Sequence, residues 1–205
     1  EELQALKEYQ LAIDDSVDVA KEFQLLDEIF KGVNLLGDYS LKVKDQILAQ
    51  GELLAAKVIV QLLNKREVKA TFVDARKLLK TNGQFGGAQL FEDTSEDNVI
   101  AHFSKVPKGE VQVITGFIAS NLAGETTTLG RNGSNYTASL IANFLNAAEF
   151  QNYTHVNGIY SANPDLVENA KKIEKLSYQE ANEMANFGAN ILHAKTIIPL
   201  IQKNI

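Results

Sequence analysis

The 205-residue sequence contains no cysteine, which excludes disulfide bonds and any metal site built on thiolates. It lacks a long basic run and its formal net charge is -6, so nucleic acid is not expected as the main partner. It lacks a signal peptide and an apolar run of 18 residues, so we expect no membrane span and a cytoplasmic location. Its only methionine is Met184, and it opens inside an apparent helix, so we expect a fragment of a longer chain.

The residues that are present have an ordinary globular composition, with 45% hydrophobic and 22% charged side chains. Apolar residues at helical spacing predict helices through the first third, with a stop and re-entry between Gly32 and Gly37. A nearly all-apolar helix over 53–63 is expected to lie buried between other elements. Three scattered histidines without metal-ligand spacing give no case for zinc, so no resident metal is expected.

Short β-prone runs alternate with helical patterns in the rest of the chain. Strands are predicted over 68–74, 111–118, 126–129 and 150–156, and helices over 136–148, 177–187 and 193–204. Ser177 and Glu180 form a capping box before one helix, and residues 94–97 carry a similar pattern before Val99. The alternation favours a mostly parallel sheet with helices on both faces.

The most informative stretch is 128–138, which places two glycines, an arginine and a serine between a strand and a helix. A glycine turn that opens a helix presents free N–H groups to an anion, and Arg131 adds a fork suited to carboxylate or phosphate. The alternative is a simple turn with Ser134 or Asn135 as N-cap and a surface arginine; spacing alone does not decide. A second turn at 157–158 also follows a predicted strand, so the two turns are candidates for halves of one site.

Several ordered motifs resemble those of aspartate kinases in the amino-acid kinase family. LGRNGSNYTA at 129–138 resembles the family's GRxGSD-Y-[ST]-A motif, and residues 116–118 resemble its GF strand end. The others are Gly51-Glu52, like the family's GE substrate site, and the runs at 153–164, 176–181 and 187–193, like its nucleotide loop, SYxEA and FGAK elements. The resemblance covers about 30–205 and is greatest to the kinase domain of bifunctional aspartokinase–homoserine dehydrogenases.

The resemblance implies ATP-dependent phosphorylation of the L-aspartate β-carboxylate, toward lysine, threonine and methionine. It implies a three-layer α/β/α sandwich with a mostly parallel central sheet, here incomplete at the N-terminus. Residues 1–205 would form one kinase-type domain, with a substrate side that includes 30–135 and a nucleotide side over about 150–205. The implied partners are L-aspartate, ATP with Mg²⁺, further copies in a homo-oligomer, and downstream ACT or homoserine dehydrogenase domains.

On the substrate side, the resemblance gives each motif residue a role. Arg131 would hold the α-carboxylate of the substrate as a bidentate fork, and Ser134 would donate a hydrogen bond beside it. Glu52 would pair with the substrate ammonium, and Phe117 would form a wall of the pocket. These roles suit an amino acid, which needs one cationic and one anionic clamp in a fixed relation.

On the nucleotide side, Thr154 and Tyr160 would contact ATP, but charged motif positions differ from the family. The family's N-terminal K-F-G-G lysine is absent, and five further positions have lost or reversed their charge: Asn135, where the family has an acid that organises the site, and His155, Asn163, Asp165 and Asn190. Phosphoryl transfer depends on positioning and cationic stabilisation, so we expect weak or no activity from this chain alone.

Two classes of function therefore stay open: an aspartate kinase domain, or a degenerate kinase module that binds aspartate or serves assembly and regulation. Other family members that act on glutamate, acetylglutamate or UMP are disfavoured, because Glu52, Arg131 and the SYxEA element follow the aspartate version. His155 also has two interpretations, a base in the nucleotide loop or a polar residue at a strand end.

Overall fold

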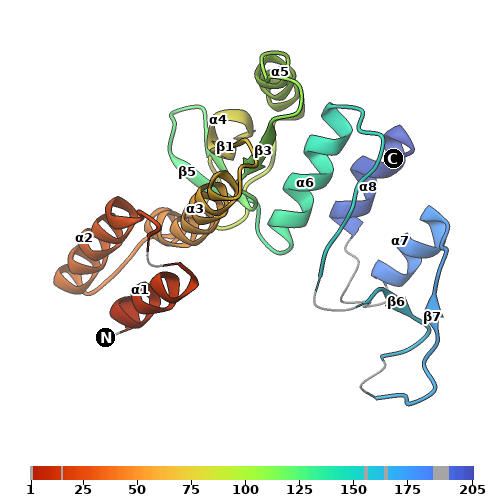
Figure 1. The fold of residues 1–205 in the computed structure, drawn as a ribbon, viewed down its shortest axis with the longest axis horizontal. Coiled ribbons are helices and arrows are strands. Elements are labelled where there is room, and N and C mark those ends of the chain that lie inside the picture. The colour runs from red at the N-terminus through yellow and green to blue at the C-terminus, as the bar shows by residue number, and fades with distance from the viewer. Residues whose placement is uncertain (1, 15, 155–156, 164–165, 187–193) are drawn as a thin grey trace. The chain divides into compact units, whose positions relative to one another are not determined.

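The computed structural model describes residues 2–14, 16–154, 157–163, 166–186 and 194–205 (Figure 1). The chain divides into two compact units, unit 1 (Glu1–Ser134) and unit 2 (Asn135–Ile205), and each is described by itself. The boundary falls in the first turn of helix α6 (Gly133–Phe144).

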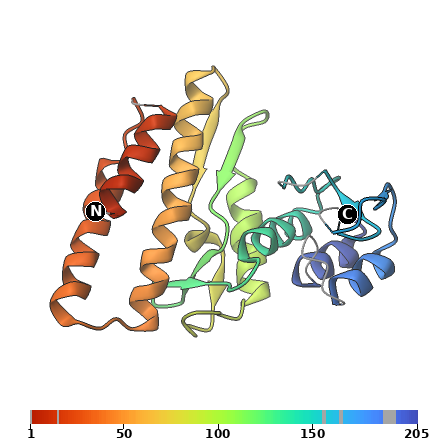
Figure 2. The ribbon, with the colours of Figure 1, turned by 90° about the horizontal axis from the view of Figure 1, so that it is seen from below.

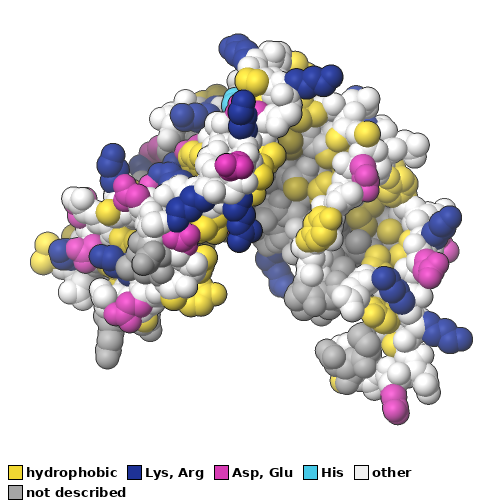
Figure 3. Space-filling view, in the orientation of Figure 1, with side chains coloured by type: hydrophobic (Ala, Val, Ile, Leu, Met, Phe, Trp, Pro, Cys, Tyr) yellow, Lys and Arg dark blue, Asp and Glu magenta, His cyan; other side chains and the backbone are white. Residues whose placement is uncertain are grey.

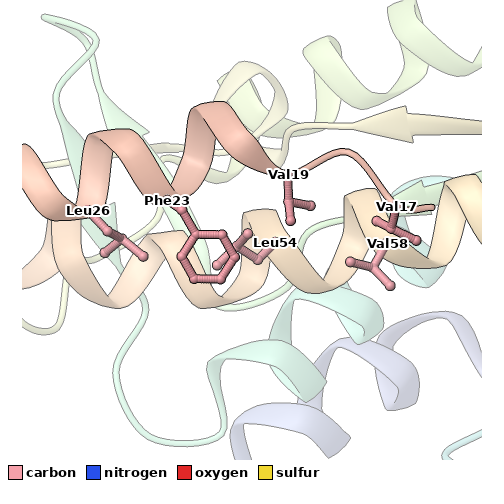
Figure 4. Close-up of a cluster of buried hydrophobic side chains, with 6 residues drawn as sticks. All are labelled: Val17, Val19, Phe23, Leu26, Leu54 and Val58. Atoms are coloured by element: carbon pink, nitrogen blue, oxygen red, sulfur yellow. The ribbon is translucent and has the colours of Figure 1, made fainter. Parts of the chain in front are cut away.

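Unit 1 begins with helices α1 (Glu2–Ile13), α2 (Ala20–Leu36) and α3 (Leu41–Lys65). An apolar cluster joins α2 and the segment before it to α3 (Figure 4); its members are Val17, Val19, Phe23, Leu26, Leu54 and Val58. Burial of one such side chain contributes about 1.5–3 kcal/mol. This cluster therefore supplies much of the packing between the two helices.

Helix α2 continues through Gly32, so the predicted stop at that residue is wrong. One glycine inside a helix costs only about 1 kcal/mol relative to alanine, which the packed face of α2 outweighs. The helix ends before Gly37, whose φ is 68° and whose N–H donates to the Val33 carbonyl at 2.9 Å. Gly37 is a left-handed cap, as the sequence predicts.

Helix α3 starts at Leu41, well before the predicted residue 53, because Ser40 caps it by accepting from the Val43 N–H at 3.3 Å. It is not buried all round, since Ile59 is 47% exposed. By length and composition alone, α3 is the one helix in the described residues that could cross a membrane. Its apolar face instead packs on α2 and on strands of unit 1, so it serves as a core helix.

The strands of unit 1 are short and form two sheets. Strand β1 (Ala70–Val73) pairs in parallel with β3 (Val111–Ile114). Strand β2 (Lys80–Thr81) pairs in parallel with β4 (Ile118–Asn121), and β4 pairs antiparallel with β5 (Thr126–Thr128). The predicted strand over 111–118 is thus two strands of different sheets, because residues 115–117 break the apolar run.

Helices cover the strands of unit 1 from both sides. Helix α3 contacts β1, β3 and β5, whereas α4 (Ala75–Leu78) contacts β4 and α5 (Glu92–Phe103) contacts β2. Figure 2 shows the strands between α3 and α5. This is the α/β/α layering expected from the sequence, with most strand pairs of unit 1 parallel.

Two predicted helix starts are wrong by a few residues. Helix α5 begins at Glu92, so residues 94–97 lie inside it and cap nothing; the Ser95 hydroxyl donates to the Phe91 carbonyl at 2.7 Å. Helix α6 begins at Gly133, so Ser134 and Asn135 lie in its first turn. Ser95 thus bonds back to Phe91, and Ser134 and Asn135 lie within the first turn of α6 instead of before it.

In unit 2, strands β6 (Ile159–Tyr160) and β7 (Lys172–Ile173) pair antiparallel, and helices α7 (Tyr178–Asn186) and α8 (Ala194–Lys203) follow. The predicted strand over 150–156 is wrong for 150–154, which form no strand, and its last two residues lie outside the described ones. The capping box is confirmed: Ser177 N–H donates to Glu180 Oε2 at 2.8 Å, and Glu180 N–H to Ser177 Oγ at 3.2 Å. The Ser177 hydroxyl, which donates to Oε2 of Glu180 at 2.7 Å, and then the Ser177 N–H lower the pKa of the Glu180 carboxyl.

Candidate functional site

The end of β3 and the start of α6 approach so closely that two glycines are required. A Cβ atom at Gly116 would lie 2.8 Å from the Cα of Ser134 and 2.8 Å from its Cβ. A Cβ atom at Gly133 would lie 2.7 Å from Cδ2 of Phe117. Real Cβ atoms do not tolerate such distances, so the two segments meet only because both residues lack a side chain.

Phe117 lies at the centre of this contact in a left-handed backbone conformation, with φ of 65°. Such a conformation costs a non-glycine residue about 1–3 kcal/mol, and strain of this kind concentrates at binding and active sites. The Phe117 carbonyl accepts from the Leu129 N–H at 2.9 Å, and its side chain packs beside Leu53 and Ile118. The strained residue is therefore held by backbone and side chain together.

Glu52 and Ser134 are 82 residues apart in the sequence, yet their side chains touch. The Ser134 hydroxyl donates to Oε1 of Glu52 at 3.1 Å. Glu52 lies on α3 and is half-buried, whereas Ser134 is exposed. The side chains of Glu52 and Ser134, two residues of the predicted substrate side, thus lie in contact, and their roles toward a substrate stay predictions.

Arg131 lies in the turn that joins β5 to α6. Gly130 and Asn132 on either side have positive φ, 74° and 55°, and the Gly133 N–H closes the turn on the Gly130 carbonyl at 3.0 Å. The Arg131 side chain is exposed, and the salt bridges among the described residues involve other side chains. Its position therefore depends on the backbone that carries it.

Asp45 was missed by reasoning from sequence. It is 0% exposed, and its Oδ2 accepts from the Gly86 N–H at 2.9 Å and from the Thr128 N–H at 3.1 Å. Its Oδ1 accepts from the Thr128 hydroxyl at 2.9 Å. The signal that could have found it is an acid in a mostly apolar helix, seven residues before Glu52 and hence near the same face.

Other charged side chains of unit 1 form ion pairs that hold structure in place. Asp74 caps α4, and the Arg76 side chain lies against it with Nη2 2.6 Å from Oδ2. Burial raises the pKa of Asp74, but the hydrogen bonds and charge of Arg76 outweigh burial and lower it. On the face drawn in Figure 3, basic side chains of unit 1 are interspersed with acidic ones, and several pair across segments, such as Lys65 with Asp14.

The nucleotide-side candidates lie in unit 2. Tyr160 is half-buried in β6, and Thr154 is exposed in a stretch without regular structure. Asn135 is half-buried in α6, and the backbone carbonyl of Asn163 accepts from the N–H groups at 166 and 167. The remaining candidates, His155, Asp165 and Asn190, lie outside the described residues. The structure thus brings Glu52 and Ser134 together, and the roles of the substrate-side and nucleotide-side residues both stay predictions.

One basic residue of unit 2 was not singled out from the sequence. The Lys172 side chain lies over Gly158, where a Cβ atom would be 2.9 Å from Cε and 3.7 Å from Nζ of the lysine. The Lys172 ammonium therefore lies near the turn at Gly158, which is inside the nucleotide-loop-like run at 153–164. Pairing of β6 with β7 produces this contact, so sequence spacing gives no sign of it.

A family model and several known proteins match this chain. The family model "Amino acid kinase family" matches residues 3–205. Lysine-sensitive aspartokinase 3 of Escherichia coli is 36% identical over all of this chain and 47% of its own length. The chloroplastic bifunctional aspartokinase/homoserine dehydrogenase 1 of Zea mays is 35% identical over 88% of this chain and 20% of its own length.

Solved structures are similar as well. The crystal structure of E. coli aspartokinase III in complex with aspartate and ADP matches with a TM-score of 0.90 and 32% identity, over 98% of this chain and 46% of that one. Clostridium acetobutylicum aspartate kinase matches with a TM-score of 0.75 and 26% identity, over 99% of this chain and 42% of that one. The chain thus spans about half the length, or less, of these relatives. The expected resemblance to aspartokinases and the expected fold are confirmed, and the chain belongs to the amino acid kinase family.

Proposed function

We propose that this chain is the kinase domain of an aspartokinase, which transfers the γ-phosphoryl group of ATP to the β-carboxylate of L-aspartate in amino-acid biosynthesis. The observation that carries the proposal is the contact between Ser134 and Glu52 beside the strained Phe117. Support comes from the similar E. coli aspartokinase III structure, which is a complex with aspartate and ADP.

Recognition of the amino acid follows from the charges on the substrate side. Glu52 would accept the substrate ammonium, and Arg131 would bind the α-carboxylate through a bidentate fork. The hydrogen bond to Glu52 and the tight contact with Gly116 fix the position of the Ser134 side chain. Its hydroxyl would therefore add a third contact to the substrate. With both α-groups held, the β-carboxylate is left free to react.

The reaction itself needs no general base. The β-carboxylate of aspartate is ionised at neutral pH, so one of its oxygens attacks the γ-phosphorus without losing a proton. The bond between the γ-phosphorus and the β–γ bridging oxygen breaks, and ADP leaves with that oxygen. Catalysis then rests on alignment and on cations near the phosphates. His155 is therefore not required as a base, which removes one of its two interpretations.

Binding of ATP would involve Thr154 and Tyr160, with Lys172 as a cation at the Gly158 turn within the loop. The position of Lys172 over Gly158 is an observation that favours a phosphate-binding role despite the changed motif charges. Within the described part of the chain, no group of three or more His, Cys, Asp or Glu side chains could hold a metal. Mg²⁺ would therefore arrive on the phosphates of ATP, which fits its preference for few carboxylates and several waters.

A second candidate function is a module that binds aspartate without phosphoryl transfer. It is favoured by the neutral or reversed charges at five motif positions, namely Asn135, His155, Asn163, Asp165 and Asn190. This candidate shares the substrate side with the first, so only nucleotide binding and turnover separate them.

Titration calorimetry and a hydroxylamine trap for the acyl phosphate, both on the full-length protein, distinguish the two functions. The kinase predicts binding of Mg-ATP and formation of the aspartyl hydroxamate. Lys172→Ala should weaken ATP binding about tenfold or more, as expected for loss of a charged phosphate contact, whereas the exposed neighbour Lys175→Ala should not. Aspartate binding without ATP binding supports the module, and binding of neither ligand refutes both.

Arg131→Ala tests the substrate side in either case. It should abolish measurable aspartate binding, because an α-carboxylate would lose its bidentate partner. Arg66→Ala is the matched control, since Arg66 is exposed at the far end of α3. Equal affinity of the two variants for aspartate would refute the assignment of Arg131.

The expected homo-oligomer, downstream domains and cytoplasmic location stay predictions. Homoserine dehydrogenase is part of the names of several relatives, and the maize relative is named chloroplastic. Aspartokinase 3 of E. coli is named as a lysine-sensitive enzyme.

A further inference from the structure

Asp45 is a buried carboxylate that the proposed reaction does not use. It is 0% exposed on a mostly apolar helix, where an ionised group is costly unless it is hydrogen-bonded. Three donors meet it: the Gly86 N–H, the Thr128 N–H and the Thr128 hydroxyl. All three belong to segments outside α3, so the carboxylate is a junction between that helix, the loop at Gly86 and the end of strand β5.

The two segments that Asp45 joins run side by side toward the substrate turn. The Ala88 N–H donates to the Thr128 carbonyl at 2.8 Å, and a Cβ atom at Gly130 would lie 3.7 Å from the Cα of Gly87. Residues 86–88 therefore form a support for residues 128–130. Asp45 attaches these two segments to α3 through its bonds to Gly86 and Thr128.

The anchored residue, Thr128, lies three positions before Arg131. The next residue, Leu129, is tied to Phe117 by its N–H, and the turn then closes between Gly130 and Gly133. Because the Arg131 side chain is exposed, its place is set by these backbone anchors. The anchor at Thr128 joins the start of the turn to α3 through a side chain of that helix, and the Ser134–Glu52 hydrogen bond joins the segment after the turn to the same helix.

Glu52 lies on the same helix, seven residues or about two turns after Asp45. One rigid helix thus carries the anionic clamp itself and, through Asp45, the anchor of the cationic clamp. We propose that Asp45 is a positioning residue of the aspartate site, which fixes the separation of Glu52 and Arg131. The proposal rests on the proposed function, since it assigns these two residues as the clamps.

The chemistry of the junction makes a sharp test possible. In Asp45→Asn the amide oxygen can take the place of Oδ2 and accept both N–H groups. The amide NH₂ then takes the place of Oδ1 and donates to the Thr128 hydroxyl, which rotates to accept. Asp45→Asn therefore keeps the junction and removes only the charge, whereas Asp45→Ala removes all three bonds.

The experiment compares steady-state kinetics of both variants in the full-length protein. For Asp45→Ala we expect a loss of about 10- to 100-fold in kcat/KM for aspartate, with the KM for ATP unchanged, because misplacement of a clamp by about 1 Å has effects of this size. Asp45→Asn should stay within about threefold of the parent, since its hydrogen bonds persist. An equal loss in both variants would overturn the proposal, because the charge and not the junction would then matter.

A control separates positioning from stability alone. Ser95 is also 0% exposed in unit 1, and its hydroxyl bonds the backbone at Lys80 and Phe91. Ser95→Ala should lower the melting temperature without changing the KM for aspartate. If Ser95→Ala and Asp45→Ala change that KM alike, Asp45 has no special role.

Hydrogen exchange gives a readout that needs no ligand. In the full-length protein, Asp45→Ala should speed exchange at residues 128–133 and leave the half of α3 around Glu52 protected, whereas Asp45→Asn should not. Unchanged exchange at 128–133 in Asp45→Ala refutes the positioning role. If exchange there is faster in Asp45→Ala but the parent protein binds no aspartate, the structural role of Asp45 is supported and the proposed function is refuted.

Discussion

The two units hold their candidate residues in different ways. In unit 1, Glu52, Phe117 and Ser134 are fixed by close glycine packing, a strained backbone and direct hydrogen bonds. In unit 2, Thr154 lies in an irregular stretch and Tyr160 in a strand of two residues. An amino acid with two charged α-groups needs fixed partners, so we expect substitutions in unit 1 to have larger and more specific effects.

The largest expected effect comes from adding a side chain at Gly116, where the segment after β3 meets the start of α6. Gly116→Ala would place a Cβ atom 2.8 Å from the Ser134 backbone, which cannot move without shifting α6. We expect a loss of about 1–3 kcal/mol in the free energy of unfolding, as for overpacked cores, together with loss of aspartate binding. Denaturant titration and calorimetry measure the two effects.

Gly32→Ala is the control for that substitution. It lies inside α2 with nothing within 4 Å of the new Cβ atom, so it should stabilise by up to about 1 kcal/mol. A Gly116→Ala protein as stable as Gly32→Ala would show that the close approach is not present in solution.

The next effect concerns the charge of Glu52. Glu52→Gln keeps an oxygen for the Ser134 hydroxyl but loses the partner of the substrate ammonium, so aspartate affinity should fall about 10- to 100-fold, equivalent to 1.5–3 kcal/mol. Glu96→Gln on α5 is a matched control that should bind normally. An unchanged dissociation constant for Glu52→Gln, measured by calorimetry, would remove Glu52 from the site.

A smaller effect is expected in unit 2 from the capping box. Ser177→Ala removes the hydroxyl that accepts from the Glu180 N–H, and loss of such a cap costs about 1 kcal/mol. The change should lower the stability of α7 without altering aspartate binding. A loss of aspartate affinity in this variant would break the division of roles between the units.

The smallest effect is a pH dependence. The folded-state pKa of Asp74 lies below its ordinary value near 3.8, so its contribution to stability is present above that pH and is lost as pH falls through the folded pKa. Asp74→Asn should therefore lower stability at neutral pH and flatten the acid limb of the stability curve. Thermal melts between neutral pH and about pH 2 test this, since an unchanged acid limb would contradict the role of Arg76 as its partner.

The motifs that carry the family resemblance are short and local, so the candidate substrate residues could be named from the sequence, whereas the contact between Glu52 and Ser134 spans 82 residues and comes from the fold. Glycines at close approaches and a hydroxyl next to a helix start leave clear motifs, and the Ser177 capping box is equally local. Asp45 could not be assigned, because its partners at Gly86 and Thr128 are distant in sequence and bind through backbone groups that any residue carries. The break between β3 and β4 at residues 115–117 could not be predicted, because the sequence is apolar on both sides of it. The left-handed backbone of Phe117 depends on tertiary contacts, which residue propensity does not report.

The hydrogen bond between Ser134 and Glu52 spans 82 residues, and this has a consequence for the order in which the protein is made. At synthesis rates of about 5–20 residues per second, Ser134 follows Glu52 out of the ribosome by roughly 4–16 s. During that interval the anionic half of the site exists without its hydroxyl and cationic partners. Contacts of such long sequence separation also form slowly, so the ability to bind aspartate should be among the last properties that the folding chain acquires.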